Sequence, residues 1–494
     1  MATVWVNGVP HRVTAGTRLS EVLFDAPHPC AGKGVCGKCR VRAEGALSPL
    51  SAAEERHLTA FEIADGVRLS CCALVQGDCR VTVSTDGAMA VVVDGKGFAA
   101  TAAPAFAAYG AAVDIGTTTL AARLYDAAGN RLAQDGCINP QVAFGADVLS
   151  RIQAAGEGQD LTTPLQNAVN DLLKRLASEA DIDPAAIDSI VITGNTAMLC
   201  FFTATDTAPL AKAPFTLPRA FGETLSALQL GLTALSAHTA VYLPPCVSAF
   251  IGADAVCAAL ACGVGLDGRT FMLADMGTNG EMLLQHKDAL YACSTAAGPA
   301  FEGVGISCGM PAMAGAIDEV ALVNGQPTVH TIGGGKAVGI CGSGLVDAAA
   351  CLLATEEMDK TGCIGDAPVP LAEHIALTQE DIRALQQAKG AVCGGLQTLL
   401  HRADLTADEV EVLYVAGGFG SRLGGRNVAA IGLIPRGLAS CIQPVGNAAL
   451  DGASRLLLDG SARDRLPALI AKMQVVELAT DPYFVDQFVK NMAF

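Results

Sequence analysis

The sequence predicts an α/β protein in two parts, a small β-rich N-terminal domain and a larger two-lobed domain built on a duplicated α/β unit. Three observations carry this prediction. Cysteines cluster in a glycine-rich loop near the N-terminus, a D-x-G-T sequence occurs twice further on, and an Ala/Gly-rich stretch separates the two regions. We therefore expect a first domain at 1–85, a linker at 86–110, and a two-lobed domain at 111–494 with lobes of roughly 111–265 and 266–494.

Four cysteines near the N-terminus form the most specific pattern in the chain. Cys30, Cys36 and Cys39 are spaced C-x5-C-x2-C in a loop that also contains three glycines, and Cys71 follows at a distance. Glycines let such a loop fold around a compact object with its N–H groups directed at sulfide. Three clustered cysteines and one distant cysteine are typical of a plant-type [2Fe–2S] cluster. We therefore predict that these four cysteines are the iron ligands.

A zinc ribbon is the alternative reading of this cysteine pattern, but it requires a second C-x2-C pair. The chain has none after the loop, because Cys71 and Cys72 are adjacent and Cys79 stands alone. We expect Cys72 and Cys79 not to be ligands, and Cys72 to pack as a small apolar residue.

The residues that flank the cysteines predict a small β-sheet. Val4–Val6 and His11–Val13 favour strands joined by a hairpin at Asn7-Gly8. The further elements expected are a helix over Arg18–Ala26 capped by Thr17, a strand over Lys38–Ala43, a helix over Ala52–Leu58 and a strand over Cys79–Val83. This order resembles the β-grasp fold of plant-type and adrenodoxin-type ferredoxins. In those families an arginine-leucine-small run precedes the fourth cysteine, as Arg68-Leu69-Ser70 precedes Cys71 here.

Composition limits the partners and the compartment. The chain has a net charge of −17, of which residues 1–84 contribute +1 and the remainder −18. The strong negative charge of the region after residue 84 argues against binding of nucleic acid or an anionic membrane. We find no signal-peptide pattern at the start and no apolar stretch of about 20 residues that could span a bilayer. Eighteen cysteines without a secretion signal predict a cytoplasmic protein.

The region between the two parts is rich in Ala and Gly and poor in charge at 86–110. A flexible tether of about 15 residues spans roughly 20 Å, which suits a small redox domain that visits more than one docking site. A segment packed on the body is the other reading, and the sequence leaves both open.

The body contains an internal duplication in which each copy reads D-x-G-T in a strand–turn–strand setting. Its members are Asp114, Gly116, Thr117 and Thr118 in the first copy and Asp275, Gly277, Thr278 and Asn279 in the second. A turn glycine lets backbone N–H groups approach phosphate oxygens, and the preceding carboxylate can hold Mg2+ through water. Two facing copies therefore predict a phosphate site with Asp114 and Asp275 as the Mg2+ residues.

The duplication extends to strands over Ser189–Thr193 and Val412–Ala416 and to two small-residue helices over 252–260 and 447–456. Small residues let helices approach closely, so a hinge between the lobes is expected there.

Two further features have alternative readings. Gly342, Ser343 and Gly344 open a helix, where they could bind an anion or form a tight turn that caps a buried helix. Glu302 could polarise a water molecule for ATP hydrolysis or cap a loop, and Glu281 has a similar standing. The eight histidines show no metal-binding spacing.

The duplicated motifs resemble those of the ATPase family that groups acetate and sugar kinases, Hsp70 and actin (ASKHA). That family has two α/β lobes, each on a twisted five-stranded sheet, with ATP between them. The resemblance makes the two D-x-G-T copies the phosphate motifs. It also implies an adenosine motif at Gly417, Gly418, Phe419 and Gly420.

A ferredoxin domain fused to this ATPase resembles the reductive activators of corrinoid-dependent methyltransferases. Their ATPase part carries runs like those found here at Thr193–Thr196, Gly298–Gly303, Gly339–Gly344 and Ala416–Gly420. Some relatives insert a further small domain after the cluster, for which this chain has little room. The resemblance implies an ATP-hydrolysing electron-transfer activator with a [2Fe–2S] cluster, ATP and Mg2+. It would reduce cobalt(II) of a corrinoid protein by one electron to restore cobalt(I).

The same resemblance implies a corrinoid protein of a methyltransferase system and an upstream low-potential electron donor as partners, and a homodimer is expected. A small-molecule kinase with a redox-sensing ferredoxin domain is the alternative, although no general base for it stands out. Activators of radical dehydratases share the ATPase fold but hold a [4Fe–4S] cluster through cysteines of the ATPase part. The ligand set here lies outside that part, which argues against them.

Overall fold

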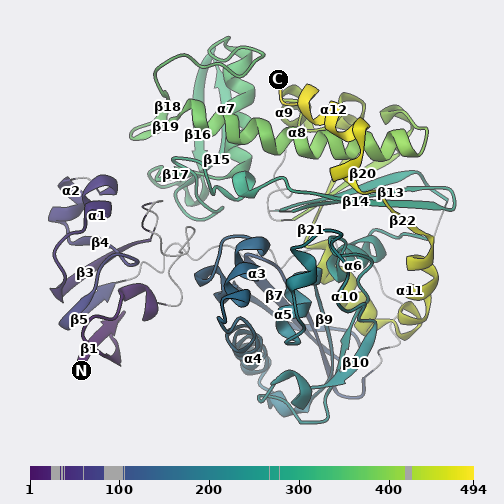
Figure 1. The fold of residues 1–494 in the computed structure, drawn as a ribbon, viewed down its shortest axis with the longest axis horizontal. Helices are drawn as coiled ribbons and strands as arrows, with labels where there is room; N and C mark the ends of the chain where they lie inside the picture. The colour runs from purple at the N-terminus through teal and green to yellow at the C-terminus, as the bar shows by residue number, and fades with distance from the viewer. Residues whose placement is uncertain are drawn as a thin grey trace. The chain divides into compact units, whose positions relative to one another are not determined.

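The structure is a computed structural model of the 494-residue chain (Figure 1). The described residues are 1–23, 34, 37, 39–58, 60–82, 104, 106–265, 268–277, 279–417 and 425–494. The predicted features outside this described part are Cys30, Cys36, Thr278, Gly418, Phe419, Gly420 and most of the linker at 86–110. The chain divides into two compact units. Unit 1 comprises Met1–Ala88 and Ile138–Pro164, and unit 2 comprises Met89–Cys137 and Leu165–Phe494.

The N-terminal part of unit 1 is a mixed sheet in the order β2-β1-β5-β3-β4. Its strands are β1 (Ala2–Val6), β2 (Val9–Val13), β3 (Arg40–Leu47), β4 (Val67–Leu69) and β5 (Val75–Thr82). Strand β1 is parallel to β5, and the other neighbouring strands are antiparallel. Asn7 and Gly8 both have positive φ, which a tight hairpin between β1 and β2 requires. The sheet agrees with the predicted β-grasp arrangement.

The helices of unit 1 confirm one prediction and correct another. Helix α1 (Ala52–His57) lies where a helix was expected, and α2 (Ala60–Ala64) follows it. A helix over Arg18–Ala26 capped by Thr17 was predicted, and residues 24–26 lie outside the described part. Over the described residues 18–23, the structure has only a short 3-10 turn at Leu19–Glu21 without a side-chain cap. The N–H groups of Leu19 and Ser20 donate to the carbonyls of Ala73 and Ser70, which take the place of the predicted Thr17 cap. The later stretch of unit 1 contains α3 (Val148–Gly156).

Unit 2 is built on two six-stranded sheets with related strand orders, one strand more in each than the five that the resemblance implied. The first sheet runs β10-β11-β9-β6-β7-β8 and the second runs β21-β20-β12-β13-β14-β22. The strands of the first sheet are β6 (Tyr109–Ile115), β7 (Thr119–Asp126), β8 (Arg131–Ile138), β9 (Ile187–Gly194), β10 (Glu223–Ser226) and β11 (Ala240–Leu243). The strands of the second sheet are β12 (Phe271–Met276), β13 (Gly280–His286), β14 (Ala289–Thr295), β20 (Val412–Ala416), β21 (Ile442–Gly446) and β22 (Met473–Val475).

The pairing pattern confirms the duplication. Strand β6 pairs antiparallel with β7 and parallel with β9, and β12 pairs antiparallel with β13 and parallel with β20. The parallel series continues to β11 in the first sheet and to β21 in the second. Each D-x-G-T copy therefore occupies the same place, the turn of the first hairpin of its sheet.

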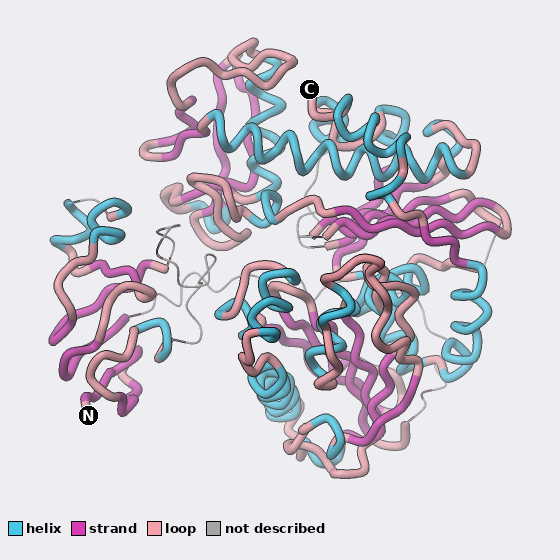
Figure 2. The backbone as a smooth tube through the Cα atoms, in the orientation of Figure 1, coloured by secondary structure: helices cyan, strands magenta, loops and turns pink. Residues whose placement is uncertain are grey.

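Helices α6 (Ala253–Ala261) and α10 (Ala448–Leu458) lie between the two sheets (Figure 2). One side of α6 packs with the second sheet, and its Val256 and Leu260 pack with the first. A Cβ at Gly452 of α10 would lie 1.9 Å from the Cys257 carbonyl oxygen, so only glycine permits this crossing. Leu450 and neighbouring leucines of α10 complete the apolar face of the first sheet, together with α11 (Gly460–Lys472).

The other face of the second sheet is covered by the long helix α8 (Gln379–Arg402), with α12 (Pro482–Lys490) packed against it (Figure 1). Alternate residues of β12 and β13 explain the double coverage. Met272 and Met282 share a core with α8, whereas Leu273 and Leu283 share one with α6. Further helices are α4 (Thr162–Glu179), α5 (Thr196–Phe202) and α9 (Gly425–Ala430).

A subdomain is inserted between β14 and α8. Its elements are β15 (Ala316–Val323), β16 (Gln326–Thr331), β17 (Gly339–Ile340), α7 (Gly342–Ala354), β18 (Val369–Ala372) and β19 (Ile375–Leu377). In the part of the chain that the structure describes, no helix has both the length and the apolar character to span a membrane.

Candidate functional site

Two of the four predicted cluster cysteines are described, and the sheet brings them together. Cys39 directly precedes β3 and Cys71 follows β4, and these strands are antiparallel with Arg40 opposite Leu69. The strand ends that carry the cysteines therefore meet. The two Sγ atoms lie 3.1 Å apart, and both side chains are buried among Leu58, Leu69 and neighbouring apolar residues.

This thiol pair has an unequal affinity for protons. The hydrogen bond between the two thiols lowers the pKa of Cys39 to about 6, and the same contact raises the pKa of Cys71. A thiolate at neutral pH is the form that binds metal. Two converging, buried sulfur atoms are the donors that an iron–sulfur centre uses. The described half of the predicted ligand set thus fits such a centre.

The neighbouring cysteines have packing contacts. A Cβ at Gly34 would lie 3.1 Å from Cys72 Sγ, so this thiol fills the space beside a glycine whose φ is +70°. Cys79 is buried in the apolar core of the sheet, and burial raises its pKa. These contacts agree with the prediction that Cys72 and Cys79 are not ligands, which stays a prediction.

A buried ion pair supports the strand that leads to Cys71. Arg68 Nε lies 2.8 Å from Glu54 Oε1, and Glu54 is fully buried. The same carboxylate accepts the backbone N–H of Leu69 at 3.1 Å and caps α1 at Ser51. Arg68, which was predicted from its place before Cys71, therefore ties β4 to α1.

The first D-x-G-T turn joins β6 to β7. Gly116 N donates to Thr119 O at 2.9 Å, and a Cβ at Gly116 would lie 2.7 Å from that oxygen. Only glycine allows so tight a turn. Asn195 Nδ2 donates to Thr117 Oγ1 at 3.0 Å, which fixes the turn against the end of β9.

The second turn joins β12 to β13, with Gly277 N donating to Asn279 O at 3.2 Å, an acceptor one residue closer in sequence than in the first turn. Its surroundings are more acidic, because Asp275 lies opposite Glu281 across the hairpin, whereas Asp114 lies opposite Ala121.

Glu302 links the two turns. It lies at the end of a short 3-10 helix over Pro299–Glu302, and its Oε2 accepts a hydrogen bond from Thr118 Oγ1 at 3.1 Å. A Cβ at Gly277 would lie 3.7 Å from its Oε1. One carboxylate therefore bonds the first D-x-G-T turn and lies beside the second, although the two turns come from different sheets and lie far apart in sequence.

Several acidic side chains gather around these turns and raise one another's pKa. Burial raises the pKa of Asp114 to about 6, although a hydrogen bond from Asn447 opposes the shift. Burial, followed by repulsion from Asp114, raises the pKa of Asp275 to about 7. The pKa of Asp254 is also raised to about 7, by burial and by repulsion from Asp114 and Asp275. Burial and repulsion from Asp254 and Asp275 raise the pKa of Glu281.

This concentration of negative charge fits a site that holds a cation together with phosphate groups. Among the described residues, no three acidic, histidine or cysteine side chains are placed to enclose a metal ion by themselves. Mg2+ does not need such a cage, because it keeps several waters and binds through one or two carboxylates plus substrate phosphates. Asp114 and Asp275 fit that mode of binding.

Other predicted nucleotide residues have close backbone contacts. Gly417 has φ +89°, and a Cβ there would lie 2.9 Å from Asp275 Oδ1, so it adjoins the second turn. Gly342, Ser343 and Gly344 open α7, where Ser343 Oγ donates to Asp318 O and a Cβ at Gly344 would lie 2.3 Å from Ile317 O. Those α7 contacts are what close helix–strand packing requires, and a nucleotide role for the segment stays a prediction.

Sequence reasoning missed three polar residues of this site. Asp254 stands in the first turn of α6, which was expected only as a helix of small residues. Asn195 and Asn447 cap α5 and α10, and each also donates to a D-x-G-T turn, Asn447 through Asp114 Oδ2 at 2.9 Å. An asparagine before a helix is a common cap and could be predicted from the sequence. The hydrogen bonds from these asparagines to Thr117 and Asp114 depend on tertiary packing.

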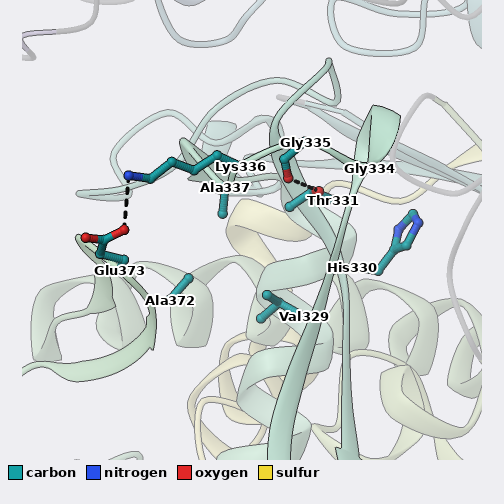
Figure 3. A pocket seen from close by; sticks show the side chains of 9 residues that line it. All are labelled: Val329, His330, Thr331, Gly334, Gly335, Lys336, Ala337, Ala372 and Glu373. Atoms are coloured by element: carbon teal, nitrogen blue, oxygen red, sulfur yellow. Dashed lines mark hydrogen bonds and ion pairs between the residues drawn. The ribbon is translucent and has the colours of Figure 1, made fainter.

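A separate pocket of about 410 Å3 lies in the inserted subdomain (Figure 3). Lys336 Nζ and Glu373 Oε2 form an ion pair of 3.0 Å at its edge, and Thr331 Oγ1 donates to Gly335 O at 2.7 Å. The residues that line it are Val329, His330, Thr331, Gly334, Gly335, Lys336, Ala337, Ala372 and Glu373. None of them belongs to the predicted cluster or nucleotide residues.

Comparisons with known proteins cover most of the chain. Residues 109–267 match the family model described as the RACo middle region, and residues 269–494 match the model of the C-terminal domain of RACo, the ASKHA domain. The structure is similar over 100% of its length to a solved "Reductive activator for corrinoid,iron-sulfur protein". The TM-score is 0.71 with 26% sequence identity, and 98% of that chain is covered.

Two curated relatives are similar over 78% of this chain. The "Corrinoid activation enzyme RamQ" of Eubacterium limosum is 33% identical over 419 residues, which is 70% of its length. The "[Co(II) methylated amine-specific corrinoid protein] reductase" of Methanosarcina barkeri is 25% identical over 421 residues, which is 77% of its length. Together with the duplicated ASKHA architecture, these matches show that the chain belongs to the family of reductive activators of corrinoid proteins.

Proposed function

We propose that this protein is an ATP-dependent reductive activator that transfers one electron to cobalt(II) of a corrinoid protein and so restores cobalt(I). Membership of the activator family supports this proposal. Both curated relatives are named for corrinoid activation or reduction, which favours it over the small-molecule kinase alternative.

The observation that best supports ATP binding and hydrolysis is the position of Glu302 between the two D-x-G-T turns. Its contacts with Thr118 and beside Gly277 bring the two turns to one place. Backbone N–H groups of both turns would hold the phosphates, and Asp114 and Asp275 would hold Mg2+ through water. Glu302 would take a proton from the attacking water.

The electron-transfer part depends on Cys30, Cys36, Cys39 and Cys71 as ligands of a [2Fe–2S] cluster. The 3.1 Å approach of the Cys39 and Cys71 sulfur atoms supports this assignment. A plant-type cluster supplies one electron at a potential of about −400 mV. Burial of both side chains keeps water away from the sulfur atoms.

ATP binding would be coupled to electron transfer through the contact between the two lobes. Thr118 follows a strand of the first sheet, and Glu302 follows a strand of the second, so a nucleotide that engages both turns acts directly on their hydrogen bond. A ligand shifts a conformational equilibrium only by its differential affinity for the two states. ATP would favour the lobe arrangement that presents the surface to which the corrinoid protein binds.

The remaining partners follow from the same proposal. An upstream low-potential donor would reduce the cluster, the protein would work in the cytoplasm, and a homodimer is the proposed assembly.

Anaerobic mixing of the reduced protein with a cobalt(II) corrinoid protein tests this function. We expect the absorption of cobalt(I) to appear with Mg–ATP and not without it. Asp275→Asn should retain the cluster spectrum and lose the ATP-dependent signal. Equal cobalt(I) formation with and without Mg–ATP would contradict the proposal, as would ATP-dependent phosphorylation of a small molecule at the expense of cobalt reduction.

A further inference from the structure

The last residue of α1, His57, lies against the cysteine loop. A Cβ at Gly37 would lie 2.7 Å from His57 Cβ, 2.8 Å from Cγ and 3.0 Å from Nδ1. Gly37 has φ +63° and stands between two of the predicted ligands in the sequence. The imidazole therefore occupies the space that any side chain at position 37 would need.

Arg40 holds the helix end and the loop together. Its guanidinium donates to the carbonyl oxygen of Gly37 and, at 2.7 Å, to that of His57, while its Nε bonds Glu62 at 2.8 Å. Arg40 directly follows Cys39 in the chain. Arg40 thus fixes the end of α1, which carries the imidazole, beside the backbone next to a predicted ligand.

The Nε2 atom of His57 is buried and has no hydrogen-bond partner among the described residues. Leaving a buried polar atom unpaired is unfavourable, and native proteins rarely retain one. Cys36, Lys38 and Thr59 lie outside the described residues, so the partner is either a residue of that part of the chain or a group that the loop binds. Sulfur atoms of an iron–sulfur cluster are anionic acceptors, and the imidazole in its Nε2–H form is a donor.

We propose that His57 Nε2–H donates a hydrogen bond to a sulfur atom of the bound cluster and raises its reduction potential. This inference rests on the proposed cluster at Cys30, Cys36, Cys39 and Cys71. Hydrogen bonds to the sulfur atoms are one of the means by which a protein sets the potential of such a centre. The bond favours the reduced cluster, because reduction adds negative charge to the acceptor. His57 is a positioning and tuning residue in this proposal and not a ligand.

The first experiment compares His57→Leu with His11→Leu in the full-length, anaerobically loaded protein. His11 lies on β2, at the opposite sheet edge from β4, and is a matched control. Iron content and the visible spectrum establish loading. At one fixed ambient potential, we expect the ratio of oxidised to reduced cluster to rise about tenfold in His57→Leu, which is 59 mV for one electron. His11→Leu should leave it unchanged, and His57→Gln, which keeps a donor of similar reach, should restore part of the shift.

The second experiment needs no substitution. Pulsed electron paramagnetic resonance of the reduced wild-type cluster, with 15N-labelled histidine, should detect one weakly coupled nitrogen. The coupling should persist in His11→Leu and vanish in His57→Leu.

The outcomes separate this inference from the proposed function. A loaded wild-type cluster without any histidine coupling would overturn the inference, even if His57→Leu fails to bind iron. So would an unchanged redox ratio in a fully loaded His57→Leu protein. Absence of a [2Fe–2S] spectrum in the wild-type protein would instead contradict the cluster itself.

Discussion

The two D-x-G-T hairpins share a backbone but differ in their electrostatic surroundings. At the first turn, Asp114 accepts a hydrogen bond from Asn447 and lies opposite an alanine. At the second turn, Asp275 lies opposite the buried Glu281 and is repelled by Asp114 and Glu302. Both copies place a glycine in the turn, and the second copy carries the excess of negative charge. We infer that the second turn depends more strongly on a bound cation.

The largest effect expected from this difference is that of Asp275→Asn. Loss of this carboxylate should reduce ATP hydrolysis by about 100-fold or more, because a catalytic metal supplies several kcal/mol of transition-state stabilisation. Asp114→Asn should reduce it less. Steady-state hydrolysis rates of both variants, measured with saturating Mg2+, test the order. A larger loss in Asp114→Asn would invert the comparison.

Glu302→Gln should have the next largest effect. Glutamine keeps an acceptor for Thr118 but loses the charge, so a lower rate reports on the carboxylate itself. Loss of a charge-assisted hydrogen bond to water predicts a decrease of roughly 10–100-fold. Thr118→Val, which removes only the contact between the turns, should cost less than tenfold. Identical rates in Glu302→Gln and the wild type would remove Glu302 from the mechanism.

Asn447→Ser should make the first turn more like the second. Serine can still cap α10, but it is too short to keep the 2.9 Å bond to Asp114. The pKa of Asp114, now about 6, should rise towards that of Asp275. The acid limb of the pH–rate profile should therefore move to higher pH, with at most about a tenfold loss at pH 7. An unshifted acid limb would show that Asp114 does not control it.

The smallest effect expected is on stability. The pKa values of Asp254 and Asp275 are about 7 in the folded protein, above the usual value of 3.8, so between about pH 4 and 7 the folded chain binds more protons than the unfolded chain. The free energy of unfolding of the nucleotide-free protein should thus fall as pH rises from 5.5 to 8. In Asp275→Asn this fall should be smaller by about 1 kcal/mol or more. Denaturant unfolding at several pH values measures both slopes. Parallel slopes would contradict the assigned repulsion.

The backbone of the sites was predictable because it depends on local patterns. The turn at Gly116 requires glycine for steric reasons, and the β1–β2 hairpin follows from Asn7-Gly8. The side chains that act on these turns were harder to predict. Asp254 reaches the acidic group only because α6 passes between the sheets, and His57 reaches the loop only because Arg40 joins the two.

The α7 segment shows why a glycine-rich loop is ambiguous in sequence. Gly344 is close to the backbone of β15, as a helix packed tightly on a strand requires. A phosphate loop needs the same lack of side chains for a different reason, so the letters Gly-Ser-Gly alone do not separate the two roles.

The placement of α10 has a consequence for how the ATPase part can be divided. This helix belongs to the last quarter of the chain, yet its leucines complete the apolar face of the first sheet. A fragment that ended after α6 would expose that face to water and would be prone to aggregate. The two lobes are therefore not separable folding units, although each contains one copy of the duplication. Any split of this protein into working fragments must leave everything from β6 to α12 on one piece.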